Sequence, residues 1–218
     1  AIRLFGIEYQ LLRAEFVGTP ERVTRERIER VLVVSGGTDA AGARQALAAA
    51  VCAAIRDAEI DVVDAPLSAA ALRDAMLAAD VAVSAAGQTL YELAATGTPT
   101  VAVVVADNQL AQARAFERAG AVLLAGEWGE SGTIEAVTAA VVALADPERR
   151  DEHSAAARAL VDGRGAERLA RRLVGEAVAG RIELRPAGAA DEVALLALAN
   201  APALRGASFQ TDPIDEAT

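Results

Sequence analysis

Short apolar segments alternate along the chain with longer segments in which apolar residues recur every three or four positions. The short segments lie at 31–34, 60–63, 81–83, 100–105 and 121–124. Between them, Leu47, Val51 and Ile55 mark one helical face, and residues 134–144 carry another. Continuous apolar strands separated by helices are typical of parallel sheets. The pattern therefore predicts the α/β class, with a Rossmann-like parallel sheet and helices on both faces.

The pattern of apolar and polar residues changes near both ends of this region. Residues 1–28 are polar with scattered apolar positions, and Gly18 and Pro20 interrupt any long element. We predict that they form an interdomain connector, followed by a Rossmann-like domain over residues 29–179. After Gly180, the pattern predicts a strand at 181–186 and a helix at 189–199. Residues 180–218 are therefore predicted to be the truncated start of a further domain.

Composition and charge narrow the range of partners. The chain has 218 residues, a formal net charge of -10 and only 3% aromatic residues. An acidic chain repels phosphate backbones, and few aromatic rings are present to stack bases, so nucleic acid is not expected as a partner. No run of about 18 apolar residues is present, so no membrane span is predicted.

The termini and the single cysteine bear on the cellular setting. One cysteine excludes an internal disulfide and fits a reducing cytoplasm, which is the expected location. The first residues lack both the layout of a signal peptide and an initiator methionine. We expect the chain to begin partway into a longer gene product.

Two glycine-containing turns join predicted strands to predicted helices. Gly36, Gly37 and Thr38 follow the first strand, where backbone N–H groups at a helix N-terminus can approach a phosphate. An ordinary tight turn with Thr38 or Asp39 as the helix cap is equally compatible. The second turn contains Ser84, Gly87, Gln88 and Thr89, whose small residues leave space for a diphosphate. In parallel sheets such turns share one edge, where ligands bind.

Polar residues beyond these turns are the other candidates for ligand contact. Glu92 can accept hydrogen bonds from ribose hydroxyls, although a solvated carboxylate near a helix N-terminus explains it as well. Asp107, Asn108 and Gln109 follow the strongest strand, and either contact a sugar or cap a helix.

The remaining chemistry-bearing residues carry no prediction of catalysis. His153 is the only histidine and lies in a charged helix, which predicts a solvated position. Cys52 lies on an apolar helical face and is predicted to be in the core. Trp128 lies in a glycine-rich loop and either packs or forms a lid. Histidine, cysteine and carboxylates do not cluster, so neither a metal site nor a cofactor is predicted.

Several of these motifs together resemble a known family. The runs 83–93 (VSAAGQTLYEL), 97–100 (GTPT) and 106–109 (ADNQ) are similar to the C-terminal domain of the UDP-sugar hydrolases of pseudaminic acid biosynthesis. These enzymes are relatives of the peptidoglycan N-acetylglucosaminyltransferase. The turn 35–39, the run 162–168 (DGRGAER) and the segment 9–16 (YQLLRAEF) fit the same family. The resemblance covers roughly residues 7–175.

The resemblance implies the C-terminal half of a GT-B fold, which holds UDP and acts without a metal. It implies that Gly36, Gly37 and Thr38 face the sugar-diphosphate and that Gly87, Gln88 and Thr89 hold phosphate. It likewise implies that Glu92 binds ribose and that residues 107–109 reach the sugar. The family's catalytic histidine belongs to the N-terminal domain and has no counterpart here, so no catalytic residue is assigned.

This sequence also departs from the family. Ala86 and Gln88 stand where the family more often has Gly and Ser. Between Ile55 and Leu72 the chain is shorter by about one βα unit, which would remove part of the uracil pocket's wall. The tail, with residues 182–187 and 205–209, resembles the first strand and helix of a GNAT-type N-acetyltransferase, without its acetyl-CoA loop.

Three functions remain open at this point. The first is the UDP-sugar-binding half of an enzyme that hydrolyses a UDP-2,4-diacetamido-2,4,6-trideoxyhexose to release UDP in nonulosonic acid biosynthesis. The others are a glycosyltransferase that uses a UDP-sugar donor and a non-catalytic nucleotide-binding module. The expected partners are UDP or a UDP-sugar and the missing N-terminal GT-B domain. This chain alone is expected to bind without completing the reaction.

Overall fold

The computed structural model describes residues 6–35, 42–174, 191, 193, 194 and 197. The chain divides into two compact units, residues 1–173 and residues 174–218. The first unit contains every strand of the described chain. The strand predicted at 181–186 and most of the helix predicted at 189–199 lie outside the described residues.

A five-stranded parallel sheet with the order β2-β1-β3-β4-β5 forms the centre of the first unit. The strands are β1 Arg30–Val34, β2 Glu59–Val62, β3 Val81–Ala85, β4 Thr100–Val104 and β5 Val122–Glu127. All residues of β3 and β4 are buried, as expected for strands covered on both faces. The parallel sheet predicted from the alternating pattern is therefore confirmed.

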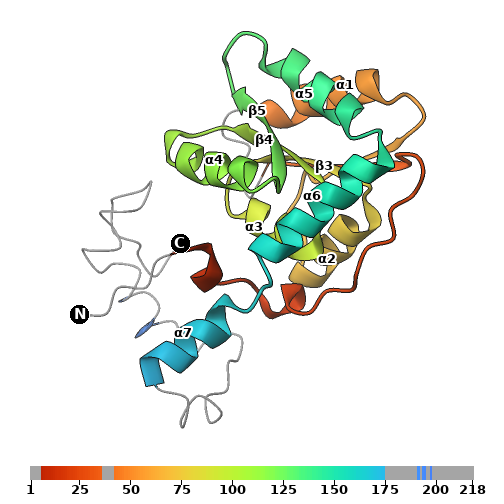
Figure 1. The fold of residues 1–218 in the computed structure, drawn as a ribbon. Helices are drawn as coiled ribbons and strands as arrows, with labels where there is room; N and C mark the ends of the chain where they lie inside the picture. The colour runs from red at the N-terminus through yellow and green to blue at the C-terminus, as the bar shows by residue number, and fades with distance from the viewer. Residues whose placement is uncertain (1–5, 36–41, 175–190, 192, 195–196, 198–218) are drawn as a thin grey trace. The chain divides into compact units, whose positions relative to one another are not determined.

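Helices cover both faces of the sheet (Figure 1). They are α1 Ala43–Ala54, α2 Ala69–Ala78, α3 Thr89–Thr96, α4 Leu110–Arg118, α5 Thr133–Ala143, α6 Pro147–Leu160 and α7 Gly165–Val174, with short 3-10 turns at Ile7–Tyr9, Ala14–Phe16 and Asp107–Gln109. Alternate residues of the strands point to opposite faces. Leu32 packs in one core cluster with residues of α2, α3 and α4, whereas Val31 and Val33 pack in another with α1 and α5.

The strand order bears on the length of the chain between β1 and β3. The commonest dinucleotide-binding order is 3-2-1-4-5-6. Removing the third strand and its helix from that order, and renumbering, leaves the order 2-1-3-4-5 that is observed. The chain between β1 and β3 contains only α1, β2 and α2. This arrangement is compatible with the shortening by one βα unit that the sequence indicates.

Two local expectations are corrected by the structure. Cys52 is exposed rather than in the core, because α1 buries Leu47 and Val51 and the next position turns away from that face. His153 is half-buried rather than solvated, and its Nδ1 is buried with no hydrogen-bond partner. Residues 107–109, which were expected to contact a sugar or to cap a helix, form the 3-10 turn Asp107–Gln109, and α4 begins directly after it at Leu110.

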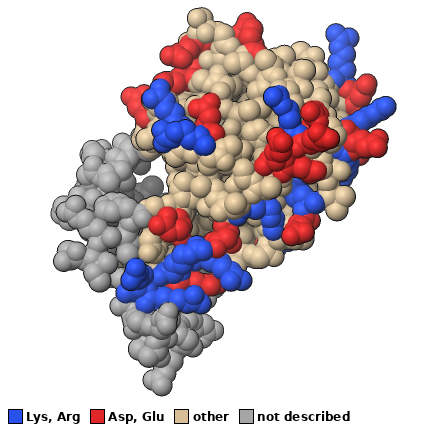
Figure 2. All heavy atoms as spheres, viewed as in Figure 1, with Lys and Arg blue, Asp and Glu red and all other residues tan. Residues whose placement is uncertain are grey.

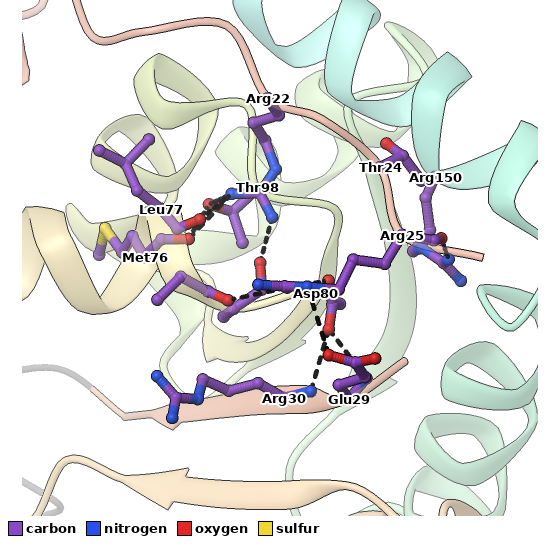
Figure 3. Close-up of polar contacts among 12 residues, drawn as sticks. Arg22, Thr24, Arg25, Glu29, Arg30, Met76, Leu77, Asp80, Thr98 and Arg150 are labelled. Atoms are coloured by element: carbon purple, nitrogen blue, oxygen red, sulfur yellow. Dashed lines mark hydrogen bonds and ion pairs between the residues drawn. The ribbon is translucent and has the colours of Figure 1, made fainter. Parts of the chain in front are cut away.

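The segment 19–30 is fastened to the edge of the sheet where the strands begin (Figure 3). Asp80, which precedes β3, is 4% exposed. Its Oδ2 accepts hydrogen bonds from the backbone N–H groups of Glu29 at 2.8 Å and Arg30 at 3.0 Å, and its Oδ1 accepts one from Arg25 at 2.6 Å. These bonds fix the entrance of the chain into β1.

Two arginines, one half-buried and one fully buried, complete this attachment at the ends of helices. Arg22 donates to the carbonyls of Met76 at 3.0 Å and Leu77 at 3.1 Å, which lie in the last turn of α2. Burial lowers the pKa of Arg22 to about 10, so it is still charged at neutral pH. Arg150, which is 1% exposed, donates to Leu144 O at 2.6 Å, beyond the end of α5. Cations at helix C-termini satisfy carbonyls that lack intrahelical partners.

The start of the described chain is attached to α7. Arg168 donates to the backbone carbonyl of Glu8 at 3.1 Å and pairs with Asp162. A methyl group at Gly165 would overlap the carbonyl oxygen of Gln10, so the two backbones meet closely here. Figure 2 shows acidic and basic side chains interspersed on the viewed face, with basic side chains gathered over α7. The contacts of Arg168 with Glu8 and of Gly165 with Gln10 hold residues 6–16 against the Rossmann-like domain.

Candidate nucleotide site

The sheet contains one point at which the order of strand addition reverses. β1 lies between β2 and β3, so the connections from β1 to β2 and from β2 to β3 run in opposite directions across the sheet. Ligands of open α/β sheets bind at the carboxyl ends of the strands at such a point. Here those ends are Val34 of β1 and Ala85 of β3, and the turns predicted to bind phosphate follow directly from them.

A pocket of about 230 Å³ lies at this edge. Its wall includes Val34 at the end of β1, Arg44 in the first turn of α1, residues 63–67 after β2, and Thr89 and Glu92 on α3. Arg13 reaches the same pocket from the connector, and Leu72 of α2 completes the wall. Apolar and charged groups therefore meet in one concave site, as is usual for sites that bind small ligands.

Glu92 is the buried carboxylate of this pocket. Its side chain is 8% exposed, and its Oε1 accepts hydrogen bonds from Arg13 Nε at 3.0 Å and Nη2 at 2.8 Å. Burial raises the pKa of Glu92, and the hydrogen bonds and charge of Arg13 oppose that rise. The guanidinium of Arg13 also lies over the ring of Phe16, 5.3 Å from its centroid.

The N-terminus of α3 lies next to this carboxylate. The helix begins with hydrogen bonds from Leu90 N to Gly87 O and from Tyr91 N to Gln88 O, both 3.1 Å, and no side chain caps it. Gln112 Nε2 holds the turn in place by donating to the carbonyl of Gly87 at 2.7 Å. The first N–H groups of a helix lack intrahelical acceptors and attract anions. This turn can therefore receive a phosphate group.

Positive charge lies close to the same edge on α1. Arg44 Nε donates to Ser35 Oγ at 3.0 Å and its Nη1 donates to the carbonyl of Asp64 at 3.2 Å. The guanidinium thus bridges the end of β1 to the loop after β2. Together with Arg13 it places two cations around a pocket in a chain whose net charge is negative.

The predicted site residues are only partly brought together. Thr89 and Glu92 line the pocket, and Gly87 and Gln88 begin the adjoining helix. The side chain of Gln88 is bound by the connector, since its Oε1 accepts from Gln10 at 3.1 Å and its Nε2 donates to Leu11 O at 3.3 Å. Gly36, Gly37 and Thr38 lie outside the described residues.

The other predicted residues lie away from this pocket wall. Ser84 is fully buried in β3 and its Oγ donates to Ala85 O at 2.9 Å, so its side chain is not at the pocket surface. Asp107 and Asn108 are exposed on the turn after β4, at the same edge of the sheet. Gln109 accepts a hydrogen bond from Val105 N at 3.0 Å. The residues 107–109 therefore adjoin the candidate site without lining the pocket.

Three parts of the pocket were not predicted from the sequence: Arg13, Arg44 and the loop 63–67. The segment 9–16 was singled out as a connector, so Arg13 lay within a recognised motif but had no role. Arg44 lies nine residues after Ser35, and only the start of α1 brings it back to the strand end. The loop has no motif, and its place follows from the position of β2 next to β1.

The single histidine of the chain lies away from this edge of the sheet. His153 lies in α6 near Gly120, which precedes β5 and so lies at the opposite edge of the sheet. Among the described residues, no group of three or more His, Cys, Asp or Glu could hold a metal ion. No helix in the described part of the chain is long and apolar enough to cross a membrane.

Comparison with characterised sequences finds one local match. No family model matches the chain. A segment of 55 residues is 44% identical to the pseudaminic acid cytidylyltransferase and UDP-2,4-diacetamido-2,4,6-trideoxy-beta-L-altropyranose hydrolase of Helicobacter pylori (strain ATCC 700392 / 26695). This segment is 25% of the chain and 11% of that protein. The match agrees in kind with the predicted resemblance to UDP-sugar hydrolases.

Comparison with solved structures defines the fold. A protein assigned as a UDP-N-acetylglucosamine 2-epimerase from Listeria monocytogenes aligns with a TM-score of 0.52 and 16% identity. The alignment covers 72% of this chain and 49% of that one. The glycotransferase of kitacinnamycin aligns with a TM-score of 0.49 and 24% identity, over 74% of this chain and 47% of its own. The chain thus spans about half of the structures that it matches and resembles half of a GT-B fold.

Proposed function

We propose that this chain binds UDP, or the UDP part of a UDP-sugar, in the pocket between the ends of β1 and β3. The observation that carries this proposal is the buried carboxylate of Glu92, which lies one turn beyond an uncapped helix N-terminus and lines a pocket at the switch point of the sheet. A ribose diphosphate needs both features, because its hydroxyls donate hydrogen bonds and its phosphates attract N–H groups.

The parts of the ligand follow the parts of the site. The diphosphate lies against the backbone of Gly87, Gln88 and Thr89, and the ribose lies against Glu92. The pocket beyond Glu92, with the loop 63–67 as its wall, receives the base. The resemblance also assigns Gly36, Gly37 and Thr38, which lie outside the described residues, to the sugar-diphosphate. The sugar extends toward residues 107–109, which lie at the same edge of the sheet.

The reaction that this half serves is hydrolysis of a UDP-2,4-diacetamido-2,4,6-trideoxyhexose. Water attacks the anomeric carbon, the bond from that carbon to the diphosphate oxygen breaks, and UDP leaves with the bonding electrons. The local match to the Helicobacter enzyme supports this substrate class. The contribution of the present residues is to stabilise the leaving diphosphate, since negative charge grows on it next to the N-terminus of α3.

The test is a calorimetric titration of UDP into the purified chain, with ADP as the control. Saturable UDP binding with much weaker ADP binding is expected. Absence of UDP binding in a sample shown to be folded by circular dichroism would refute the proposal.

The hydrolytic assignment has a separate test in a longer protein that includes a second GT-B domain. We expect it to release UDP from the UDP-sugar without an added acceptor, whereas this chain alone releases none. Release that depends on an added acceptor would instead assign a glycosyltransferase.

A further inference from the structure

The connector contributes a side chain to the candidate site that no motif assigns to it. Arg13 follows the turn Ile7–Tyr9 and directs both its Nε and its Nη2 to Oε1 of Glu92. Because both bonds end on Oε1, they leave the acceptor capacity of Oε2 to other partners. The arginine thus fixes the carboxylate without using all of its hydrogen-bonding sites.

Contacts on both sides hold Arg13 in this position. Phe16 is fully buried in the core cluster of α2, α3 and α4, and the Arg13 guanidinium lies over its ring. On the other side, Gln10 and the carbonyl of Leu11 bind the side chain of Gln88 at the start of α3. The segment 10–16 is therefore tied at both ends to the helix that carries Glu92, and Arg13 lies between the two ties.

We propose that Arg13 is a positioning residue that makes this pocket selective for ribonucleotides over 2′-deoxyribonucleotides, because it keeps Glu92 oriented as an acceptor for the ribose 2′-hydroxyl. The inference rests on the proposed function and adds a source of specificity to it. A site that accepts a hydrogen bond from a ligand hydroxyl discriminates against the analogue that lacks it, because its own polar group is then left unpaired.

The charge of Arg13 has a second effect on the same carboxylate. Burial alone favours the protonated form of Glu92, which raises its pKa, and Arg13 opposes this shift. The other charged groups around the pocket are Arg44 and Asp64, and Arg44 is bound to Ser35 Oγ and to the backbone of Asp64. Arg13 is thus the cation that contacts Glu92 directly, and its removal would raise the pKa of Glu92 further.

The experiment compares UDP with 2′-deoxy-UDP, which differ only in the hydroxyl at issue. Dissociation constants are measured by calorimetry for the wild-type chain, Arg13→Gln and Arg13→Lys. Arg30→Gln is the matched control, because Arg30 is similarly exposed and pairs with Glu59 at the opposite edge of the sheet. We expect the wild type and the control to prefer UDP by about tenfold or more, and Arg13→Gln to lose most of that preference while 2′-deoxy-UDP binds nearly as before.

The pH dependence of the preference separates positioning from a purely structural role. The terminal phosphate titrates at a pH of about 6 in both ligands, so this contribution cancels in the ratio of the two dissociation constants. We expect the preference for UDP to fall as pH falls, and to fall at a higher pH in Arg13→Gln than in the wild type. Arg13→Lys keeps the positive charge but not the paired N–H groups, so its pH profile should lie close to that of the wild type.

Each other outcome overturns the inference in a distinguishable way. Equal losses for both ligands in Arg13→Gln would mean that Arg13 acts on the phosphates or on the fold. If the wild type bound UDP and 2′-deoxy-UDP equally, the proposed contact of Glu92 with the 2′-hydroxyl would be refuted. The role of Arg13 would be refuted with it, whereas nucleotide binding would stand. A folded wild type that binds neither ligand would refute the proposed function itself.

Discussion

Asp80 offers the sharpest test of how the connector is held to the domain. Asp80→Ala removes an acceptor that is 4% exposed and that serves two backbone N–H groups and one arginine. A buried donor that loses its partner costs about 1–3 kcal/mol. The two donors here are part-buried and Arg25 is free to reach solvent, so we expect the free energy of unfolding to fall by about 2–4 kcal/mol, the lower part of the range for two such losses.

Asp80→Asn refines the expectation, because the amide oxygen can still accept from Glu29 N and Arg30 N. Its NH2 group would then face Arg25, which is 46% exposed on its side chain and can turn away. We expect a loss of about 1–2 kcal/mol for this variant. Asp74→Ala is the control, because that carboxylate is 63% exposed and pairs only with the neighbouring Arg73 among the ion pairs of the described chain. Its effect should be under about 0.5 kcal/mol.

The assay is urea unfolding followed by circular dichroism, with stability taken from the midpoint at constant slope. The expected order of destabilisation is Asp80→Ala, then Asp80→Asn, then Asp74→Ala. A loss within about 1 kcal/mol for Asp80→Ala would refute this role of Asp80, since two part-buried N–H groups should not lose their shared acceptor so cheaply.

Two further predictions concern single titratable side chains. Glu92→Ala should weaken UDP binding by about 1–3 kcal/mol in calorimetry, whereas Glu135→Ala, which removes an exposed first-turn carboxylate of α5, should leave it unchanged. Burial lowers the pKa of His153 below its usual 6.5, so below that pH the unfolded chain binds more protons than the folded one. Wild-type stability should therefore decline as pH falls through about 6.5, and urea midpoints at several pH values should show a smaller decline in His153→Gln.

The elements of the sheet were predictable because their signals are local. The run Thr100–Val104 is apolar nearly throughout and rich in valine, which is typical of a strand buried on both faces. Gly97, which ends α3 with a φ of 67°, is likewise a local signal, because glycine adopts this conformation without steric cost. For these residues, the neighbouring sequence is sufficient to predict the local structure.

The pocket was harder to predict because its parts are far apart in the chain. Glu92 and Arg13 are 79 residues apart, and Asp80 and Arg25 are 55 apart. No periodicity indicates which arginine meets which carboxylate, since that depends on the path of the connector over the finished sheet. The prediction that Cys52 lies in the core was wrong for a different, local reason. Alanine-rich helices give a weak apolar face, so a neighbouring position can be taken for part of that face.

Two glycines, Gly87 in the turn before α3 and Gly165 at the start of α7, allow the ligand edge and the connector contact to be tested separately. A methyl group at Gly87 would lie 3.4 Å from Gln109 Nε2, an ordinary contact with a flexible side chain. Gly87→Ala should therefore leave stability nearly unchanged. Its methyl group would still lie where the diphosphate approaches the backbone, so UDP affinity should fall by about tenfold, or 1.4 kcal/mol.

Gly165→Ala should instead reduce stability directly and affect UDP binding only as a consequence. Its methyl group would overlap the carbonyl oxygen of Gln10 and lie 2.7 Å from the carbonyl carbon, and a backbone cannot move aside as a side chain can. We expect a loss of stability of about 1–3 kcal/mol, with UDP affinity reduced because the displaced connector carries Arg13. Urea unfolding and calorimetry on both variants check this. If Gly87→Ala bound UDP as tightly as the wild type, no phosphate could lie against this turn, and the diphosphate would have to be placed elsewhere along the edge.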